Sequence, residues 1–239
     1  MKKLLSLIAS FIFPTKCIFC GKFIKDTPMR ICTECINTIK FNERYCIFCG
    51  EKLDTIYGPK LCFDCHGVKK PYDRIFVPLI YDGSVRRAII SFKYKDRISF
   101  AKTFSILIFT ELKSNGYIPD AVTFVPIHFL RKFRRGYNQT ELIAKEIANL
   151  LSVPCIPLLK KTRYTAKLAG LKGTQRRKTV KNSFGIKKDN HSYTFDNLLL
   201  VDDIITTSST VTECSFILKK EYGCNISVAA IASTQKRKI

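Results

Sequence analysis

Residues 198–211 read Leu-Leu-Leu-Val-Asp-Asp-Ile-Ile-Thr-Thr-Ser-Ser-Thr-Val, and this stretch determines the fold that we predict. Its first four residues form an apolar run with the length of a buried strand in a parallel sheet. Asp202 and Asp203 follow that run directly. In open α/β sheets, ligands bind at the carboxyl ends of the strands. The two carboxylates are therefore placed to hold ribose hydroxyls, or to act on Mg²⁺ through the water that this ion retains.

Hydroxyl residues fill positions 206–210, and residues 211–222 have the pattern of a helix that ends at Gly223. A helix N-terminus presents free backbone N–H groups and the positive end of its dipole, so it suits a phosphate. Short hydroxyl side chains add donors without crowding the anion. A simpler interpretation is a buried strand followed by an Asp-capped helix, although two adjacent Asp residues are unusual for a cap alone.

The same stretch resembles the phosphoribosyl pyrophosphate (PRPP) motif of type I phosphoribosyltransferases, in which apolar residues precede Asp-Asp and then Thr-Thr-Gly-x-Thr. By this resemblance, Asp202 and Asp203 meet the ribose 2- and 3-hydroxyls. The residues that cradle the 5-phosphate are Thr206, Thr207, Ser208, Ser209 and Thr210. Ser208 stands where the family usually has Gly. Either Ser208 adopts a positive φ despite its Cβ, or the loop differs from that of the family.

Eight of the eleven cysteines form four Cys-x-x-Cys pairs. The pairs are Cys17/Cys20, Cys32/Cys35, Cys46/Cys49 and Cys62/Cys65. The string Cys-Ile-Phe-Cys-Gly at residues 17–21 recurs at residues 46–50. This spacing is typical of structural Zn²⁺ held by four thiolates, so we expect two closed zinc sites. A disulfide framework is the alternative, and an expected cytosolic location disfavours it.

Length and charge limit the class of protein. The 239 residues fit one medium domain and a small module, and the net charge of +22 favours polyanionic partners. A merely soluble basic protein would have the same charge. Residues 1–13 are apolar after Lys2-Lys3, but they lack a convincing cleavage site and are too short to span a bilayer. We interpret them as a short helix that docks on a soluble, cytoplasmic protein.

Strands alternate with helices along the second part of the chain. Strands are predicted at residues 74–81, 121–125, 198–201 and 226–231, and helices at residues 85–94, 99–112, 139–151 and 211–222. This order predicts an α/β fold with a parallel sheet and right-handed crossovers. The predicted domains are residues 1–70, with the N-terminal apolar helix and a double zinc ribbon, and residues 71–239, with a phosphoribosyltransferase-like domain.

A cationic segment precedes the helix that Asn138 is expected to cap. It contains Arg131, Lys132, Arg134 and Arg135, and it ends in Arg-Gly-Tyr-Asn-Gln at residues 135–139. This string resembles the Arg-Gly-Phe-Asn-Gln string of the ComF family, whose members join a cysteine-rich zinc module to a phosphoribosyltransferase-like domain. The resemblance extends along nearly the whole chain, including residues 92–94 and 125–126.

Membership of the ComF family would imply handling of single-stranded DNA on the cytoplasmic side of DNA uptake in natural transformation. Expected partners are then PRPP, single-stranded DNA and other DNA-uptake proteins such as a helicase. The loop that begins at Pro126 would lie on the pyrophosphate side of the PRPP site.

Residues 160–181 contain nine Lys or Arg and no acid. Such a segment could close over PRPP, lie along a nucleic-acid backbone with Tyr164 stacked on a base, or be a solvated loop. The candidate DNA contacts are Lys167, Lys172, Arg176, Arg177 and Lys178. ComF relatives often carry Gln near position 168 and Asn near position 179, where this chain has Leu168 and Thr179.

Two classes of function remain open. The first is a competence-type DNA-handling protein that binds PRPP. The second is an active phosphoribosyltransferase, in which Mg²⁺-PRPP binds at Asp202 and Asp203 and a base nitrogen attacks C1 as pyrophosphate leaves. Arg134 and Arg135 are the candidates for stabilising that pyrophosphate. A PRPP sensor that binds without reacting is a third possibility, and the acceptor and the oligomeric state are not predicted.

Overall fold

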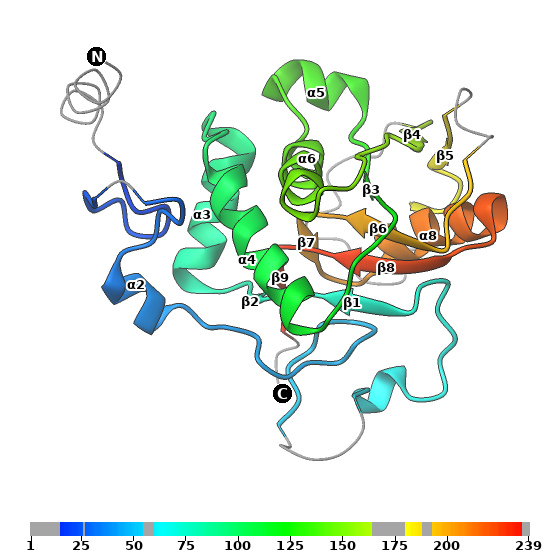
Figure 1. Ribbon diagram of the computed structural model, residues 1–239, viewed down its shortest axis with the longest axis horizontal. Helices are drawn as coiled ribbons and strands as arrows, with labels where there is room; N and C mark the ends of the chain where they lie inside the picture. The colour runs from blue at the N-terminus through cyan, green and yellow to red at the C-terminus, as the bar shows by residue number, and fades with distance from the viewer. Residues whose placement is uncertain (1–14, 26, 55–59, 164–179, 188–192, 236–239) are drawn as a thin grey trace.

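The computed structural model describes residues 15–25, 27–54, 60–163, 180–187 and 193–235 (Figure 1). The predicted N-terminal apolar helix and the five candidate DNA contacts between Lys167 and Lys178 lie outside these ranges. None of the helices within them is long and apolar enough to cross a membrane.

A four-stranded parallel sheet forms the centre of the fold, in the order β1-β8-β6-β3. Its strands are β1 (Arg74–Phe76), β3 (Ala121–Phe124), β6 (Asn197–Val201) and β8 (Asn225–Ala229). Leu200 of β6 pairs with Thr123 on one side and with Val228 on the other. Because β6 lies between two neighbours and under helices on both faces, its apolar run is buried throughout.

A three-stranded parallel sheet continues three of these strands in the same order, β2-β9-β7. It consists of β2 (Leu79–Ile80), β7 (Ile204–Ile205) and β9 (Ala232–Ser233). The single strand predicted at residues 74–81 is therefore two strands, interrupted at Val77-Pro78, where proline has no N–H for a ladder. On β6 the interruption is Asp202-Asp203, so the acidic pair lies at a bend that three adjacent strands share.

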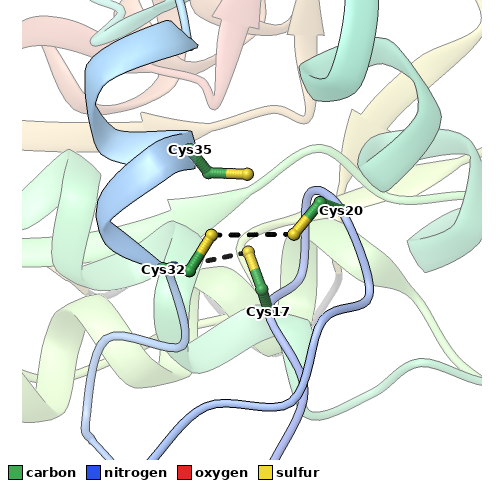
Figure 2. Close-up of side chains that lie close together, drawn as sticks. All are labelled: Cys17, Cys20, Cys32 and Cys35. Atoms are coloured by element: carbon green, nitrogen blue, oxygen red, sulfur yellow. Dashed lines mark hydrogen bonds between the residues drawn. The ribbon is translucent and has the colours of Figure 1, made fainter.

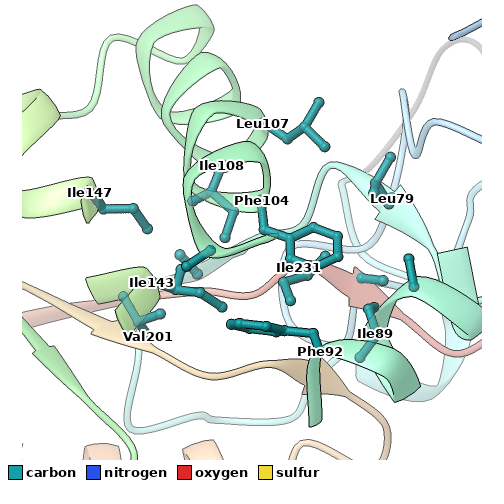
Figure 3. Close-up of a cluster of buried hydrophobic side chains, with 14 of the residues drawn as sticks. Leu79, Ile89, Phe92, Phe104, Leu107, Ile108, Ile143, Ile147, Val201 and Ile231 are labelled. Atoms are coloured by element: carbon teal, nitrogen blue, oxygen red, sulfur yellow. The ribbon is translucent and has the colours of Figure 1, made fainter. Parts of the chain in front are cut away.

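Helices cover both faces of the central sheet. The first face carries α3 (Gly83–Tyr94), α4 (Phe100–Ser114) and α6 (Gln139–Leu151), and the second carries α8 (Ser209–Tyr222). Leu199 and Val201 belong to the core of the first face, whereas Leu198 and Leu200 belong to that of the second, as the alternation of a strand requires. Figure 3 shows the first core, in which Phe92 and Phe104 meet beside Ile143.

The predicted fold class is confirmed: a parallel-sheet α/β domain follows a small module with two four-cysteine clusters. Several elements were not expected from the sequence. Helix α5 (Phe129–Arg135) lies in the cationic segment, and β4 (Leu159–Lys161) pairs antiparallel with β5 (Phe184–Ile186). Two short helices, α2 (Thr33–Thr38) and the 3₁₀ helix η1 (Phe63–Cys65), each contain one cysteine of a predicted cluster.

Two cysteine modules, one around the cluster of Cys17–Cys35 and one around the cluster of Cys46–Cys65, attach to the α/β domain differently. The first packs on α4, where the Phe19 and Phe104 rings meet edge to face at 6.4 Å. The second joins the strands, since Ile75 N–H donates to Ile47 O over 2.7 Å. The carbonyl of Gly50 accepts from Ser233 Oγ at 2.6 Å and from Asn42 Nδ2 at 3.1 Å. Contacts therefore cross the predicted boundary at residue 70, and the division into domains remains a prediction.

The repeated glycines Gly21 and Gly50 provide a matched test of this docking. Both have positive φ, of +79° and +74°, but a Cβ on Gly50 would lie 2.8 Å from Ser233 Cβ, whereas one on Gly21 meets nothing within 4 Å. We expect Gly21→Ala to cost about 1–2 kcal/mol of backbone strain, and Gly50→Ala to cost about 1–3 kcal/mol more from overpacking. Denaturant unfolding of the zinc-loaded variants measures the difference, and equal losses would contradict this docking.

Candidate functional site

The acidic pair lies at the bend between β6 and β7. Asp203 Oδ2 forms an ion pair with Lys93 Nζ at 2.8 Å, and the two side chains are only 19% and 17% exposed. Asp202 Oδ1 accepts from the Asp203 N–H at 2.8 Å, which fixes the first carboxylate beside the second. Lys93 lies at the end of α3, far from Asp203 in the sequence. The sequence offered only its place in the Phe-Lys-Tyr string at residues 92–94, with no role attached.

The hydroxyl loop, residues 206–210, leads directly into α8. Ser208 has φ +55°, so it adopts the left-handed conformation despite its Cβ, and this decides between the two alternatives that the sequence left open. Ser208 is the N-cap residue of α8 but its side chain caps no N–H. Its Oγ is buried near the Tyr72 hydroxyl without a hydrogen bond of good geometry. The start of α8 therefore keeps uncapped N–H groups beside polar side chains, which is the arrangement that binds phosphate.

The Arg-Gly-Tyr-Asn-Gln string holds the end of α3 in place. Tyr137 Oη donates to Phe92 O, and Gln139 Nε2 donates to Lys93 O at 3.3 Å. Arg135 donates to Tyr94 Oη at 3.0 Å and lies 4.7 Å from the centre of the Tyr94 ring. Three residues of the string thus bind three consecutive residues of α3. Their effect is to position the Lys93 side chain against Asp203.

Asn138 and Thr140 attach the start of α6 to the end of β3. Asn138 Oδ1 accepts from the Thr140 N–H at 3.2 Å, which confirms the predicted N-cap. Asn138 Nδ2 and Thr140 Oγ1 both donate to Val125 O, at 3.3 and 2.6 Å. All of these polar groups are buried and satisfied, so the loop from Pro126 begins and ends at fixed points.

The candidate cations Arg134 and Arg135 lie on α5 and make no described contact with the acidic pair. Arg135 is held by the neutral groups of Gln139 and Tyr94. Arg134 is exposed and has no carboxylate partner among the described residues. Their predicted role at a pyrophosphate is not tested by these contacts.

Lys161 on β4 is a partly buried cation whose pKa responds to the charge of Asp202. Burial, reinforced by the charge of Arg131, lowers the pKa of Lys161 to about 8, and Cys214 and Asp202 act in the opposite direction. The Lys161 ammonium also lies 4.7 Å from the centre of the Phe184 ring. Because its charged form is disfavoured by burial, Lys161 would be stabilised by an anion beside it. The sequence showed Lys161 only as one of many basic residues.

Both predicted cysteine clusters are assembled. Cys17, Cys20, Cys32 and Cys35 form one, which Figure 2 shows, and Cys46, Cys49, Cys62 and Cys65 form the other. The ligand atoms of each cluster lie within 4.8 Å of one another, with Cys20–Cys32 and Cys49–Cys62 sulfur distances of 3.6 Å. A tetrahedron of Zn–S bonds of about 2.3 Å has edges of about 3.8 Å, so both clusters fit structural zinc.

The remaining cysteines stand apart from these clusters. Cys214 and Cys224 are buried, whereas Cys155 is partly exposed. Burial raises the pKa of the Cys155 thiol to about 11. These thiols stay protonated at neutral pH, which suits structural rather than metal-binding residues.

The second cysteine cluster lies behind the hydroxyl loop. Ser233 donates to Gly50 O and lies on β9. Strand β9 pairs with β7, which begins directly after Asp203. Tyr72 Oη donates to Phe48 O at 2.7 Å. Burial raises the pKa of Tyr72, and the nearby Ser208 and Thr212 side chains act in the opposite direction. The zinc module therefore supports the loop from the side opposite to α3.

Comparison with known proteins gives consistent similarities. Residues 8–66 match the family "Double zinc ribbon domain". The chain is 28% identical over 214 residues to "Competence protein F" of Haemophilus influenzae, covering 87% of this chain and 92% of that protein. It is 25% identical over 227 residues to "DNA utilization protein YhgH" of Escherichia coli K12, covering 92% and 98%.

Among solved structures, a glutamine PRPP amidotransferase from B. subtilis aligns with a TM-score of 0.41 and 16% identity. The alignment covers 59% of this chain and 30% of that one. An adenine phosphoribosyltransferase aligns with a TM-score of 0.34 and 17% identity, covering 59% and 82%.

Proposed function

This chain is a ComF-like protein, and from that premise we propose that it binds PRPP with Mg²⁺ at the bend after β6 and handles single-stranded DNA during DNA uptake. The observation that carries the PRPP part is the start of α8. A positive-φ Ser208 leaves the first turn uncapped beside two carboxylates, and phosphate and ribose hydroxyls need these two kinds of group side by side.

The described contacts support a role for each group. Asp202 and Asp203 would accept hydrogen bonds from the ribose hydroxyls, and residues 206–210 would surround the 5-phosphate. Lys93 forms an ion pair with Asp203. When PRPP binds, the Lys93 side chain would either share the Asp203 carboxylate with the ribose or move towards the pyrophosphate. The hard oxygen donors of the acidic pair fit Mg²⁺, which would neutralise part of the ligand's charge.

The DNA part of the proposal has separate support. The printed names of the relatives concern competence and DNA utilization, and a net charge of +22 attracts a polyanion. Counterion release would make the affinity for single strands fall steeply with salt. Lys167, Lys172, Arg176, Arg177 and Lys178 remain candidate contacts. We place the protein in the cytoplasm, where PRPP and incoming single strands would meet, and other DNA-uptake proteins such as a helicase are candidate partners.

An active phosphoribosyltransferase is the second candidate function. Lys161 favours it, because a cation that interacts with the charge of Asp202 could stabilise pyrophosphate as it leaves C1 of the ribose. Arg134 and Arg135 remain candidates for the same role. Base-dependent release of pyrophosphate from PRPP would distinguish an enzyme from a PRPP sensor, which binds without turnover.

Calorimetric titration of zinc-loaded protein with Mg²⁺-PRPP tests the proposed site. We expect binding to the parent and a loss of at least about 100-fold in Asp202→Asn/Asp203→Asn, because each hydrogen bond to a charged group contributes about 1.5–3 kcal/mol. The control Glu43→Gln/Glu146→Gln removes the same charge elsewhere and should bind like the parent. No binding to the parent, or equal binding to the acidic-pair variant, would contradict the proposal.

The pKa of Lys161 predicts how PRPP affinity depends on pH. Because this pKa is lowered to about 8, Lys161 is charged below that pH and becomes neutral above it, where it no longer attracts pyrophosphate. Phosphate groups have lost their second proton above about pH 7, since that pKa is about 6. We therefore expect affinity to fall between pH 8 and 9.5 in the parent but to stay level in Lys161→Arg, as titrations across that range would measure. The same fall in both proteins would exclude Lys161 as the cause.

A further inference from the structure

Helix α5 exposes two aromatic rings, of which Phe129 contacts the His128 ring at 4.5 Å. Phe129 is 70% exposed and Phe133 is 89% exposed. The two are four residues apart, so their side chains lie on the same side of the helix. Single exposed apolar side chains are ordinary in soluble proteins, whereas apolar side chains that gather on one face are typical of interaction surfaces.

A third exposed ring, that of Tyr94, lies on another side of α5, because Arg135, which contacts it, is only two residues from Phe133. Tyr94 is 59% exposed, and the Arg135 guanidinium stacks on its ring and binds its hydroxyl. Tyr94 follows Lys93, whose ammonium contacts Asp203. The three rings therefore lie on α5 and on the adjoining end of α3. Figure 1 shows α5 at the outer edge of the molecule, beyond α6.

The charge around the rings is positive. Helix α5 contains Arg131, Lys132, Arg134 and Arg135 and no acid. Lys132 pairs with Glu141 at 3.4 Å, but that carboxylate is shared with Lys145 at 2.9 Å. Neither Arg134 nor Arg135 has a carboxylate partner among the described residues. The surface thus combines flat apolar rings with unneutralised guanidinium groups.

This combination selects one class of occupant. A second copy of the chain would bring another +22 charge against the same cations, which disfavours self-association. In a duplex the faces of the bases are already stacked, so the rings would find none available. A single strand offers unstacked bases to the rings and phosphates to the arginines, and both contacts are independent of sequence.

We propose that Phe129 and Phe133 form a stacking platform for single-stranded DNA, with Arg134 on its phosphates. This inference rests on the proposed function, since it assigns a place to the DNA that the protein handles. The platform is separate from the candidate contacts at residues 167–178.

Fluorescence anisotropy with a labelled oligothymidine tests the platform at fixed salt. A stacked base contributes about 1–3 kcal/mol, or about 5- to 150-fold in affinity, so Phe129→Ala/Phe133→Ala should bind at least tenfold more weakly than the parent. Phe216→Ala is the matched control, because Phe216 is also exposed, at 59%, and is followed by Lys219 and Lys220 on α8. Its affinity should change less than twofold.

Two replacements of Phe133 separate stacking from apolar contact. Phe133→Trp keeps a stacking ring and should retain parental affinity, whereas Phe133→Leu keeps an apolar side chain without a ring and should weaken binding like Phe133→Ala. Equal binding by the Leu and Trp variants would overturn stacking. A single-strand affinity no higher than that for the matching duplex would overturn it as well.

The charged part of the platform has its own readout. Arg134→Gln should lower the slope of log affinity against log salt by about 0.7, the value for one phosphate contact on a single strand, whereas Lys220→Gln should not. One guanidinium cannot bind DNA and pyrophosphate at the same time, so Arg134→Gln is also titrated with Mg²⁺-PRPP. A loss of PRPP affinity with an unchanged salt slope would assign Arg134 to pyrophosphate and overturn its role on DNA.

The outcomes also distinguish this inference from the proposed function. If the parent binds single strands and the double Phe variant binds equally well, the platform is wrong and the proposed function stands. If the parent binds no single-stranded DNA, the platform is wrong, and so is the part of the proposed function that concerns DNA. Sedimentation of the parent and the double variant tests self-association, and a parental dimer that the variant loses would make α5 an interface between copies instead.

Discussion

The fold depends on a bend that β1, β6 and β8 share. Each strand is interrupted at its carboxyl end and resumes as β2, β7 or β9, so the order of the sheet is kept while its ladder is broken. On β6 the interruption is Asp202-Asp203. Two carboxylates inside a continuous ladder would be buried without partners, whereas at a bend they keep access to solvent, to Lys93 and to a ligand. The position of the proposed site is thus a consequence of how the sheet is built.

The bend also explains why two cysteine modules with a repeated sequence are not equivalent. The first packs an aromatic ring on α4, on the outside of a helix. The second binds the strands beyond the bend through Gly50 and Ser233, and so supports the hydroxyl loop from behind. Structural zinc contributes folding free energy, and in the second module part of that free energy would hold the proposed ligand site in shape. On this view the second module belongs to the site, although none of its residues is proposed to contact the ligand.

Local patterns in the sequence predicted those parts of the site that depend on neighbouring residues. The buried run of β6, the helix after the hydroxyl loop, the Asn138 cap and both cysteine clusters follow from such patterns. The Lys93–Asp203 ion pair could not be predicted, because it joins two segments that only the folded sheet brings together. Helix α5 was missed because an arginine-rich segment after a proline was interpreted as a loop, and its exposed rings give it no amphipathic pattern.

If the account is right, PRPP binds at the bend that the second cysteine module supports, and α5, with the proposed DNA platform, is attached to the same bend through α3. Lys93 connects the parts, since its side chain contacts Asp203 while its backbone is held by the string that follows α5. Hydrogen–deuterium exchange with and without Mg²⁺-PRPP tests this claim most directly, because it locates the ligand without any substitution. The account predicts slower exchange at the amides of residues 202–210 and at the end of α3. Unchanged exchange there under saturating ligand, or slower exchange only elsewhere, would contradict it.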